Sequence, residues 1–300
     1  MPSNAAIVCE RLTKDFGHSR GIHDLDMRVE AGEAMGFLGP NGSGKTTTIR
    51  ALLDLHRPTS GRALLFGLDS HRDSRRIRAR LGTLVGEFAL DVRLTGGRAV
   101  ALAAALRGLD DLRPAHELAE RFRADLDRPV RELSRGNRQK IGLILALFHR
   151  PELLILDEPT SGLDPLMQEE FAAVVREHRE AGGAVLLSSH DLDEVQAVCD
   201  RVALIRAGRL VTIDSVDAMR DRALREVTLR LERPVDRAAL AALPGLSILS
   251  TDGPTARLRI AGSPDGLIRL LAAEHVVTLE VTRPSLDELF REHYRDEEPA

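Results

Sequence analysis

The stretch Gly39-Pro-Asn-Gly-Ser-Gly-Lys-Thr46 lies between an apolar run at 34–38 and a helical pattern that begins at Lys45. This order of strand, glycine-rich loop and helix is the setting of the phosphate-binding pattern G-x-x-x-x-G-K-[ST]. The glycines let the backbone turn its N–H groups toward phosphate oxygens, and the first helical turn adds its positive dipole end. Lys45 is expected to reach the β- and γ-phosphates, and the Thr46 hydroxyl is expected to bind Mg²⁺. The stretch therefore predicts an α/β fold with a site for a nucleoside triphosphate.

The composition is typical of a soluble globular protein with room for one large domain or two. Of the 300 residues, 43% are hydrophobic and 29% are charged. No signal peptide is recognised, and no apolar run approaches the ~18 residues of a membrane span. The net charge of −4 does not favour a nucleic-acid partner. Cys9 and Cys199 each lie in an apolar pattern, which favours two buried free thiols in a reducing cytosol over a disulfide or a metal site.

Hydrophobic patterns along the first 222 residues predict a mixed central sheet, an antiparallel edge sheet and a helical subdomain at about 87–150. Residues 24–30 alternate between apolar and charged, as a half-exposed antiparallel strand does. Residues 153–157 form a continuous apolar run, which predicts a buried parallel strand. The other strands are expected at 7–12, 34–38, 63–66, 82–85, 184–188, 202–206 and 209–213, and the helices after Lys45 and at 99–106, 114–126, 134–149, 165–181 and 192–199.

The pattern changes after Arg222, so we expect two domains, at 1–222 and 223–300. The second reads as strand 225–231, helix 235–243, strand 246–250, strand 255–260, helix 264–274 and strand 276–282, followed by a terminal amphipathic helix at 286–294. The order βαββαβ predicts a small α+β, ferredoxin-like domain. It holds no convincing catalytic cluster, so we expect a structural or regulatory role for it.

Two carboxylates follow the buried strand at 153–157. Asp157 would be delivered to the edge of the sheet beside the phosphate loop, where it can hold Mg²⁺ directly or through water. Glu158 is one residue further along and therefore points elsewhere, where it is suited to take a proton from a water that attacks the γ-phosphate. The bland alternative, a pair that caps a helix, does not explain why both follow this strand.

Two further sequence elements narrow the class of nucleotide-binding protein. Ser134 is a good N-cap for the helix at 134–149, and Gly136 lets a phosphate approach the backbone, although this pattern alone is also that of an ordinary capped helix. His190 follows the strand at 184–188 and can hydrogen-bond a γ-phosphate, although a lone histidine at such a place is often structural.

In these motifs the chain resembles the ATP-binding subunits of ABC transporters over residues 1–222. Residues 39–46 match the Walker A loop, 153–157 the Walker B strand, 133–137 the LSGGQ signature and 161–164 the D-loop. The resemblance implies ATP and Mg²⁺ as cofactors and a head-to-tail homodimer, in which each ATP lies between one subunit's phosphate loop and the other's signature. It assigns catalysis to Lys45, Glu158 and His190; ATP binding to Phe16, Gly39, Asn41, Gly42, Ser43, Gly44, Lys45, Thr46 and Thr47; the signature in trans to Ser134, Arg135, Gly136 and Asn137; the D-loop to Asp164; and the metal to Thr46 and Asp157.

The chain departs from the family pattern at two places. The signature reads Ser-Arg-Gly-Asn where the family has Ser-Gly-Gly-Gln, so Arg135 is expected either to contact the nucleotide or to face solvent. At the Q-loop position, Gly86 stands where the family's glutamine approaches Mg²⁺ and the attacking water, and Glu87 is the adjacent candidate to replace it.

These departures, and the C-terminal stretch RPSLDELF at 283–290, resemble the drug- and antibiotic-efflux ATPases of type-2 ABC exporters. The resemblance implies an ATP-hydrolysing, energy-coupling subunit at the cytoplasmic face of the membrane, held there by a separate integral membrane permease, with no nucleic-acid partner. An importer subunit and a soluble ABC ATPase that acts on the ribosome or DNA remain as alternatives. Soluble members usually carry two cassettes or a long coiled-coil insertion, whereas this chain has one phosphate loop and a short helical insertion.

Overall fold

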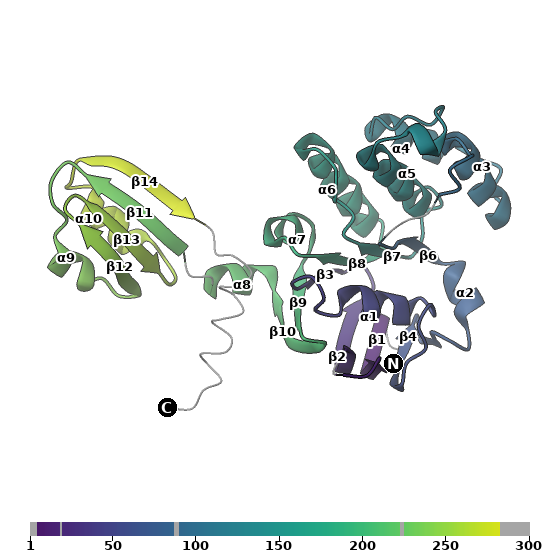
Figure 1. Ribbon diagram of the computed structural model, residues 1–300, viewed down its shortest axis with the longest axis horizontal. Coiled ribbons are helices and arrows are strands. Elements are labelled where there is room, and N and C mark those ends of the chain that lie inside the picture. Colours follow the sequence, from purple (N-terminus) through teal and green to yellow (C-terminus); the bar gives the residue numbers. More distant parts are fainter. Residues whose placement is uncertain (1–4, 19, 87–89, 223–224, 283–300) are drawn as a thin grey trace. The chain divides into compact units, whose positions relative to one another are not determined.

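The chain divides into two compact units, Met1–Ile213 and Asp214–Ala300. The structure is a computed structural model that describes residues 5–18, 20–86, 90–222 and 225–282 (Figure 1). The division falls before helix α8 (Val216–Arg222), whereas the sequence-based boundary lies after it. That boundary stays a prediction.

The first unit is built on a six-stranded sheet with the order β10-β9-β3-β8-β7-β6. Strands β9, β3, β8, β7 and β6 run parallel to one another. The carboxyl ends of these five strands therefore meet at one edge of the sheet, where ligands bind in open α/β folds. Every residue of β3 and β7 is buried, as expected for strands covered on both faces. The strands are β3 (Ala34–Leu38), β6 (Leu81–Leu84), β7 (Leu153–Asp157), β8 (Ala184–Ser189), β9 (Arg201–Arg206) and β10 (Arg209–Ser215).

A second, antiparallel sheet has the order β2-β1-β4-β5. Its strands are β1 (Ala5–Asp15), β2 (Gly21–Glu30), β4 (Ser60–Leu65) and β5 (Leu68–Asp69). In β2 the alternation predicted from the sequence is confirmed, because Leu25, Met27 and Val29 are buried and the charged residues between them are exposed. The helix that follows the phosphate loop, α1 (Lys45–Leu52), packs against β2 and β4 of this sheet and against β7 of the other, so both sheets share one hydrophobic core.

Three helices, α3 (Gly96–Arg107), α4 (Arg113–Arg121) and α5 (Arg135–Leu147), stand between β6 and β7 in the chain and form the expected helical subdomain (Figure 1). Helix α4 ends five residues before the predicted end at Leu126, because Arg123 adopts a positive φ of 48° and Leu126 instead accepts a hydrogen bond from the Gly97 N–H at 2.8 Å. The other helices of this unit are α2 (Ser74–Arg78), α6 (Pro165–Glu180) and α7 (Leu192–Val198).

The second unit contains a four-stranded antiparallel sheet with the order β12-β13-β11-β14. With two helices after the first and third strands, this is the ferredoxin-like arrangement. The elements are β11 (Arg225–Leu231), α9 (Arg237–Ala241), β12 (Leu246–Asp252), β13 (Thr255–Ile260), α10 (Asp265–Leu271) and β14 (Val276–Thr282). The expected terminal helix at 286–294 and the stretch at 283–290 lie outside the described residues.

Within the described ranges, none of the helices combines the length and the apolar character that crossing a bilayer would require.

Candidate active site

The phosphate loop joins β3 to α1 and closes around its own lysine. Gly42 and Gly44 have φ values of 79° and 115°, which side chains with a Cβ rarely adopt. The Lys45 ammonium is buried, with 5% of the residue exposed, and donates to the carbonyl oxygens of Gly39 at 2.6 Å and Pro40 at 3.4 Å. The loop therefore holds a positive charge at its centre.

The loop rests on the two-residue turn between β9 and β10. Ala207 and Gly208 both have positive φ, 48° and 76°, as the predicted hairpin turn requires. The Gly208 N–H donates to the Ser43 carbonyl at 2.8 Å, and its own carbonyl accepts from the His23 N–H at 2.8 Å. The turn thus ties the phosphate loop to β2.

A cavity of about 480 Å³ opens over this loop. Phe16 stands at its edge, 51% exposed, with the Lys14 ammonium 5.1 Å from its ring centre. The Ser43 hydroxyl is buried and has no hydrogen-bond partner among the residues that the structure describes. The cavity is lined by Phe16, Arg20, Gly21, Asn41, Gly42, Ser43, Gly44, Lys45, Thr46, Thr47, Glu158, Ala207 and Gly208. Of the predicted ATP-binding residues only Gly39 is absent from this lining, and its carbonyl binds Lys45 instead.

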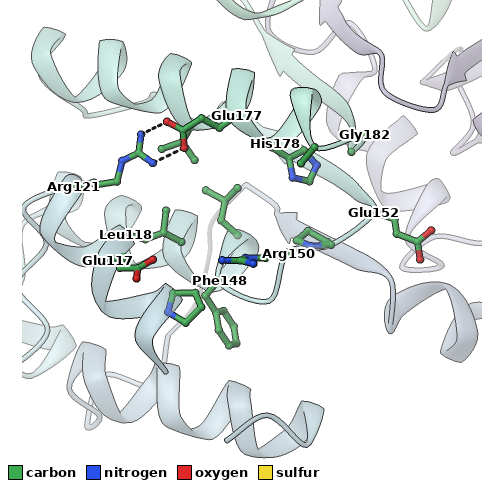
Figure 2. A pocket seen from close by; sticks show the side chains of 15 residues that line it. Glu117, Leu118, Arg121, Phe148, Arg150, Glu152, Glu177, His178 and Gly182 are labelled. Atoms are coloured by element: carbon green, nitrogen blue, oxygen red, sulfur yellow. Dashed lines mark hydrogen bonds and ion pairs between the residues drawn. The ribbon is translucent and has the colours of Figure 1, made fainter. Parts of the chain in front are cut away.

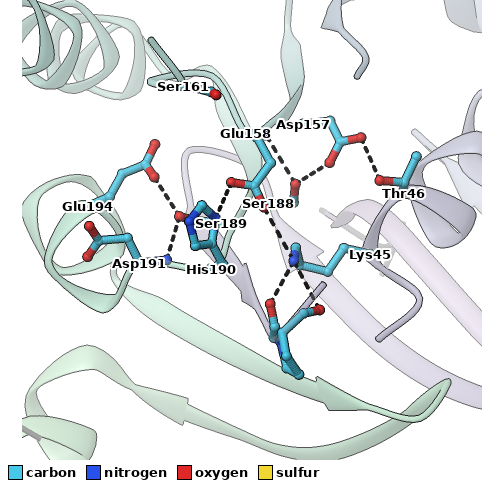
Figure 3. Close-up of polar contacts among 12 residues, drawn as sticks. Lys45, Thr46, Asp157, Glu158, Ser161, Ser188, Ser189, His190, Asp191 and Glu194 are labelled. Atoms are coloured by element: carbon cyan, nitrogen blue, oxygen red, sulfur yellow. Dashed lines mark hydrogen bonds and ion pairs between the residues drawn. The ribbon is translucent and has the colours of Figure 1, made fainter. Parts of the chain in front are cut away.

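Asp157 lies at the end of β7, beside the start of α1. The Thr46 hydroxyl donates to one oxygen of its carboxylate at 2.9 Å, and the Ser188 hydroxyl donates to the other (Figure 3). Asp157 is only 3% exposed, so the carboxylate is buried with both oxygens hydrogen-bonded. The oxygens of Thr46 and Asp157 are hard ligands of the kind that Mg²⁺ prefers, and they lie together as the sequence predicted.

Glu158 points away from Asp157, toward Lys45 and His190 (Figure 3). One carboxylate oxygen lies 3.3 Å from the Lys45 ammonium, and the other lies 2.6 Å from Nδ1 of His190. The backbone of Glu158 has φ +50°, a left-handed conformation that is unfavourable for a residue with a Cβ. The structure therefore brings Lys45, Glu158 and His190 into one cluster.

A second layer of groups supports this cluster, and the sequence reasoning missed it. The Ser189 hydroxyl donates to Glu194 at 2.5 Å and accepts from the Asp191 N–H at 2.9 Å, so it fixes the loop that carries His190. Burial raises the pKa of the Glu194 carboxyl, and the negative charges of Glu158 and Asp191 add to that rise. The signal in the sequence was a glutamate inside the first turn of α7, whose partners the sequence alone does not identify.

The signature residues bind their own chain and do not line the cavity. Ser134 caps α5 as predicted, with its hydroxyl accepting from the Asn137 N–H at 3.2 Å. The Asn137 side-chain oxygen accepts from the Asp125 N–H at 3.1 Å. Arg135 is exposed, and its guanidinium donates to the Ser161 hydroxyl at 2.8 Å. Neither role expected for Arg135, a nucleotide contact or a free solvent-facing charge, anticipated this bond within the chain.

The remaining predicted positions are a loop glycine and a helix cap. Gly86 follows β6 with φ +41°, and a Cβ built on it would lie 3.7 Å from a carboxylate oxygen of Asp157. The backbone at the Q-loop position therefore passes beside the candidate metal ligand, while Glu87 lies outside the described residues. Asp164 caps α6, because its carboxylate accepts from the Met167 N–H at 3.1 Å.

Another cavity, of about 490 Å³, lies between α4 and the C-terminal ends of α5 and α6 (Figure 2). Arg121 at its rim donates to Glu170 at 2.5 Å and to Glu177 at 2.6 Å and 2.7 Å, so its guanidinium is shared between two carboxylates. None of the predicted site residues within the described ranges lines it. The phosphate-loop cavity is therefore the candidate active site.

Comparison with known proteins gives one consistent family. A family model described as "ABC transporter" matches residues 22–161. A daunorubicin resistance ATP-binding protein of Streptomyces coeruleorubidus is 36% identical over 96% of this chain and 95% of its own length. A daunorubicin/doxorubicin resistance ATP-binding protein of Streptomyces peucetius is 35% identical over 95% and 91%. A bacitracin transport ATP-binding protein of Bacillus licheniformis is 35% identical over 70% of each chain.

Solved structures match about 70% of the chain. An ATP-binding subunit of an ABC transporter superposes with a TM-score of 0.67 and 27% identity, over 72% of this chain and 92% of the other. A dimeric bacterial ABC transporter cassette superposes with a TM-score of 0.64 and 20% identity, over 70% and 98%, which supports the fold.

Proposed function

Since this chain belongs to the ABC transporter family of ATP-binding proteins, we propose that it is the energy-coupling subunit of a bacterial exporter and drives a separate membrane permease. ATP hydrolysis is the activity of this family's cassette, and the chain is accordingly an ATPase. The observation that carries the proposal is the geometry around the phosphate-loop cavity. Lys45 and Glu158 line the cavity, and His190 holds the Glu158 carboxylate. Asp157 accepts from the Thr46 hydroxyl beside them.

The substrate class is proposed from the relatives. Two of them are named for resistance to daunorubicin or doxorubicin and one for bacitracin transport, and the first two align with this chain over almost its whole length. We therefore assign the chain to efflux of a drug, an antibiotic or another hydrophobic compound, which would bind the permease.

The residues over the phosphate loop fit ATP and Mg²⁺. The buried Ser43 hydroxyl has no partner within the described part of the chain. It lines the cavity together with Lys45, whose positive charge attracts phosphate oxygens. Phe16 offers an exposed ring face to a base at the edge of the cavity. The oxygens of Thr46 and Asp157 would hold Mg²⁺, which when bound neutralises charge on the phosphates.

Glu158 is the proposed general base. Its carboxylate lines the cavity and is aimed by two partners, Lys45 and His190. A carboxylate held in this way can take a proton from an attacking water, while His190 keeps it from turning away. The strained φ of Glu158 supports a functional reading, because such conformations persist where the surroundings enforce them.

We propose a homodimer because the nucleotide site within one chain lacks its signature residues. Residues 134–137 carry the signature, yet none of them lines the cavity of their own chain. A head-to-tail pair of chains would let the signature of one subunit close the cavity of the other. The permease would hold this pair at the cytoplasmic face of the membrane.

Replacing Glu158 tests the catalytic assignment. Glu158→Gln keeps the shape and removes the base, so we expect ATP turnover to fall by about 10²- to 10⁴-fold. Binding of a fluorescent ATP analogue should remain, and dimers should accumulate in light scattering with ATP. The matched control is Glu169→Gln, an exposed glutamate on α6 outside the cavity, which should turn over normally. Glu158→Gln at the parental rate would refute the assignment.

The transport role needs its own experiment. Affinity purification of the tagged chain from detergent-solubilised membranes should recover an integral membrane protein in a fixed ratio. Recovery of that protein together with an extracytoplasmic binding protein would instead indicate import. Ribosomal proteins or DNA, without a membrane protein, would contradict the exporter proposal.

A further inference from the structure

Two side chains from the start of α5 hold the backbone segment that begins at Glu158. The Gln139 amide donates to the carbonyl oxygen of Glu158 at 3.2 Å and to that of Pro159 at 2.7 Å. Arg135 donates to the Ser161 hydroxyl at 2.8 Å. One helix end therefore contacts three of the four residues from 158 to 161.

These bonds act on a strained residue. Glu158 has φ +50°, a strained conformation that persists only when the surroundings enforce it. On the N-terminal side, the Glu158 N–H donates to the carbonyl and the hydroxyl of Ser188, at 3.1 Å and 3.2 Å. On the C-terminal side, the carbonyls of Glu158 and Pro159 have Gln139 as their side-chain donor. The backbone of Glu158 is thus fixed from β8 on one side and from α5 on the other.

The packing between α5 and this segment is also close. A Cβ on Gly136 would lie 2.5 Å from the Gly162 carbonyl oxygen. A Cβ on Gly162 would lie 3.6 Å from Cγ and 3.7 Å from Cδ of Arg135. The turn that carries the signature and the residues after Glu158 therefore pack closely against each other.

We propose that Gln139 is a positioning residue for the Glu158 carboxylate. Arg135 supports the same backbone segment by holding Ser161. The inference rests on the proposed role of Glu158 as base. Gln139 does not line the nucleotide cavity, so it acts on turnover through the backbone of Glu158 and leaves nucleotide contacts intact. Because the same helix end carries Ser134, a shift of the signature moves the base as well.

The test is a series at Gln139 in the full chain, read by steady-state ATP hydrolysis and thermal unfolding. Gln139→Ala removes the donor, so we expect kcat to fall by about 10- to 100-fold, with KM for ATP within about twofold of the parent. Gln139→Glu sets an acceptor against two carbonyl oxygens and should be at least as slow. Gln139→Lys restores a donor and should recover kcat to within about threefold of the parent.

A matched control separates positioning from general stability. Gln168 in α6 also donates its amide to a backbone carbonyl, that of Leu163, at 3.3 Å, and it does not contact Glu158. Gln168→Ala should keep the parental kcat. A purely structural role for Gln139 would lower the melting temperature of the Ala and Lys variants and leave the kcat of the folded protein unchanged.

The outcomes distinguish this inference from the function on which it rests. If Glu158→Gln is inactive and Gln139→Ala turns over normally, Glu158 is the base and the positioning role is wrong. Equal kcat losses in Gln139→Ala and Gln139→Lys also overturn it, because the donor is then irrelevant. If Glu158→Gln itself is active, the proposed function fails first. Arg135→Ala should show a smaller kcat loss than Gln139→Ala, since Arg135 holds only the Ser161 side chain.

Discussion

Replacing Gly136 by alanine tests how tightly the start of α5 packs on the segment after Glu158. A Cβ at Gly136 would lie 2.5 Å from the Gly162 carbonyl oxygen, whereas real Cβ atoms keep at least 3.0 Å from such an atom. The two backbones must therefore separate by about 0.5 Å, the difference between those distances. A backbone oxygen cannot turn aside as a side chain can, so we expect the usual overpacking cost of about 1–3 kcal/mol. At roughly 2–4 °C per kcal/mol, the melting temperature should fall by roughly 2–12 °C.

Gly97 provides a matched control. It is the second residue of α3, as Gly136 is the second residue of α5. A Cβ on Gly97 would lie 3.5 Å from the Leu126 carbonyl oxygen, an ordinary contact. Gly97→Ala should keep or raise the melting temperature, because alanine in a helix is favoured over glycine by roughly 0.5–1 kcal/mol.

Thermal unfolding and steady-state ATP hydrolysis are measured side by side for both variants. The shift at Gly136 displaces the segment that carries Glu158, so kcat should fall by about 10-fold or more. KM for ATP should rise as well, because Gly136 belongs to the signature that we propose closes the partner subunit's cavity. If Gly136→Ala melts and turns over like Gly97→Ala, the steric reasoning is wrong.

Two further predictions concern buried titrating groups. Burial raises the pKa of Cys9 to about 12 and also raises that of Cys199, so neither thiol should react with iodoacetamide at pH 8 until urea unfolds the chain, as intact mass will report. Burial lowers the pKa of His149 to about 4 from 6.5, so the unfolded chain takes up a proton that the folded protein excludes. The contribution of His149 to stability is therefore present above pH 6.5 and is lost as the pH falls toward 4. Urea unfolding midpoints should fall less steeply with pH across this window in His149→Gln than in the parent. The same pH dependence in both proteins would contradict the lowered pKa of His149.

Local patterns were enough to predict much of the fold. The strand at 153–157 was predicted with its correct bounds, because a strand buried on both faces is a continuous apolar run. The hairpin at Ala207 and Gly208 and the Ser134 cap were also predicted, since each depends on residues only a few positions apart. The predicted end of α4 was wrong because the Leu126 carbonyl accepts a tertiary hydrogen bond from the Gly97 N–H, which no local pattern records.

Site residues with a motif were predicted, and those without one were missed. Lys45, Asp157 and Glu158 lie in recognisable local sequences, so their neighbourhood could be anticipated. Gln139 reaches a segment about twenty positions away, and Ser188 on β8 reaches Asp157 on the neighbouring strand β7. Such partners depend on the register of the sheet and on helix packing, which the sequence pattern leaves free.

The turn at 207–208 also sets the order in which the protein can mature on the ribosome. The phosphate loop is encoded within the first 50 residues, but Gly39 and Gly44 pack against Ile205, and Gly208 holds the loop by its backbone. Contacts between such distant segments form late, because the intervening chain must first be made and closed. A nascent chain that stops before residue 208 of 300 therefore carries the nucleotide-binding sequence without the support that shapes it. The contacts that hold the phosphate loop are therefore complete only after more than two-thirds of the chain has been made.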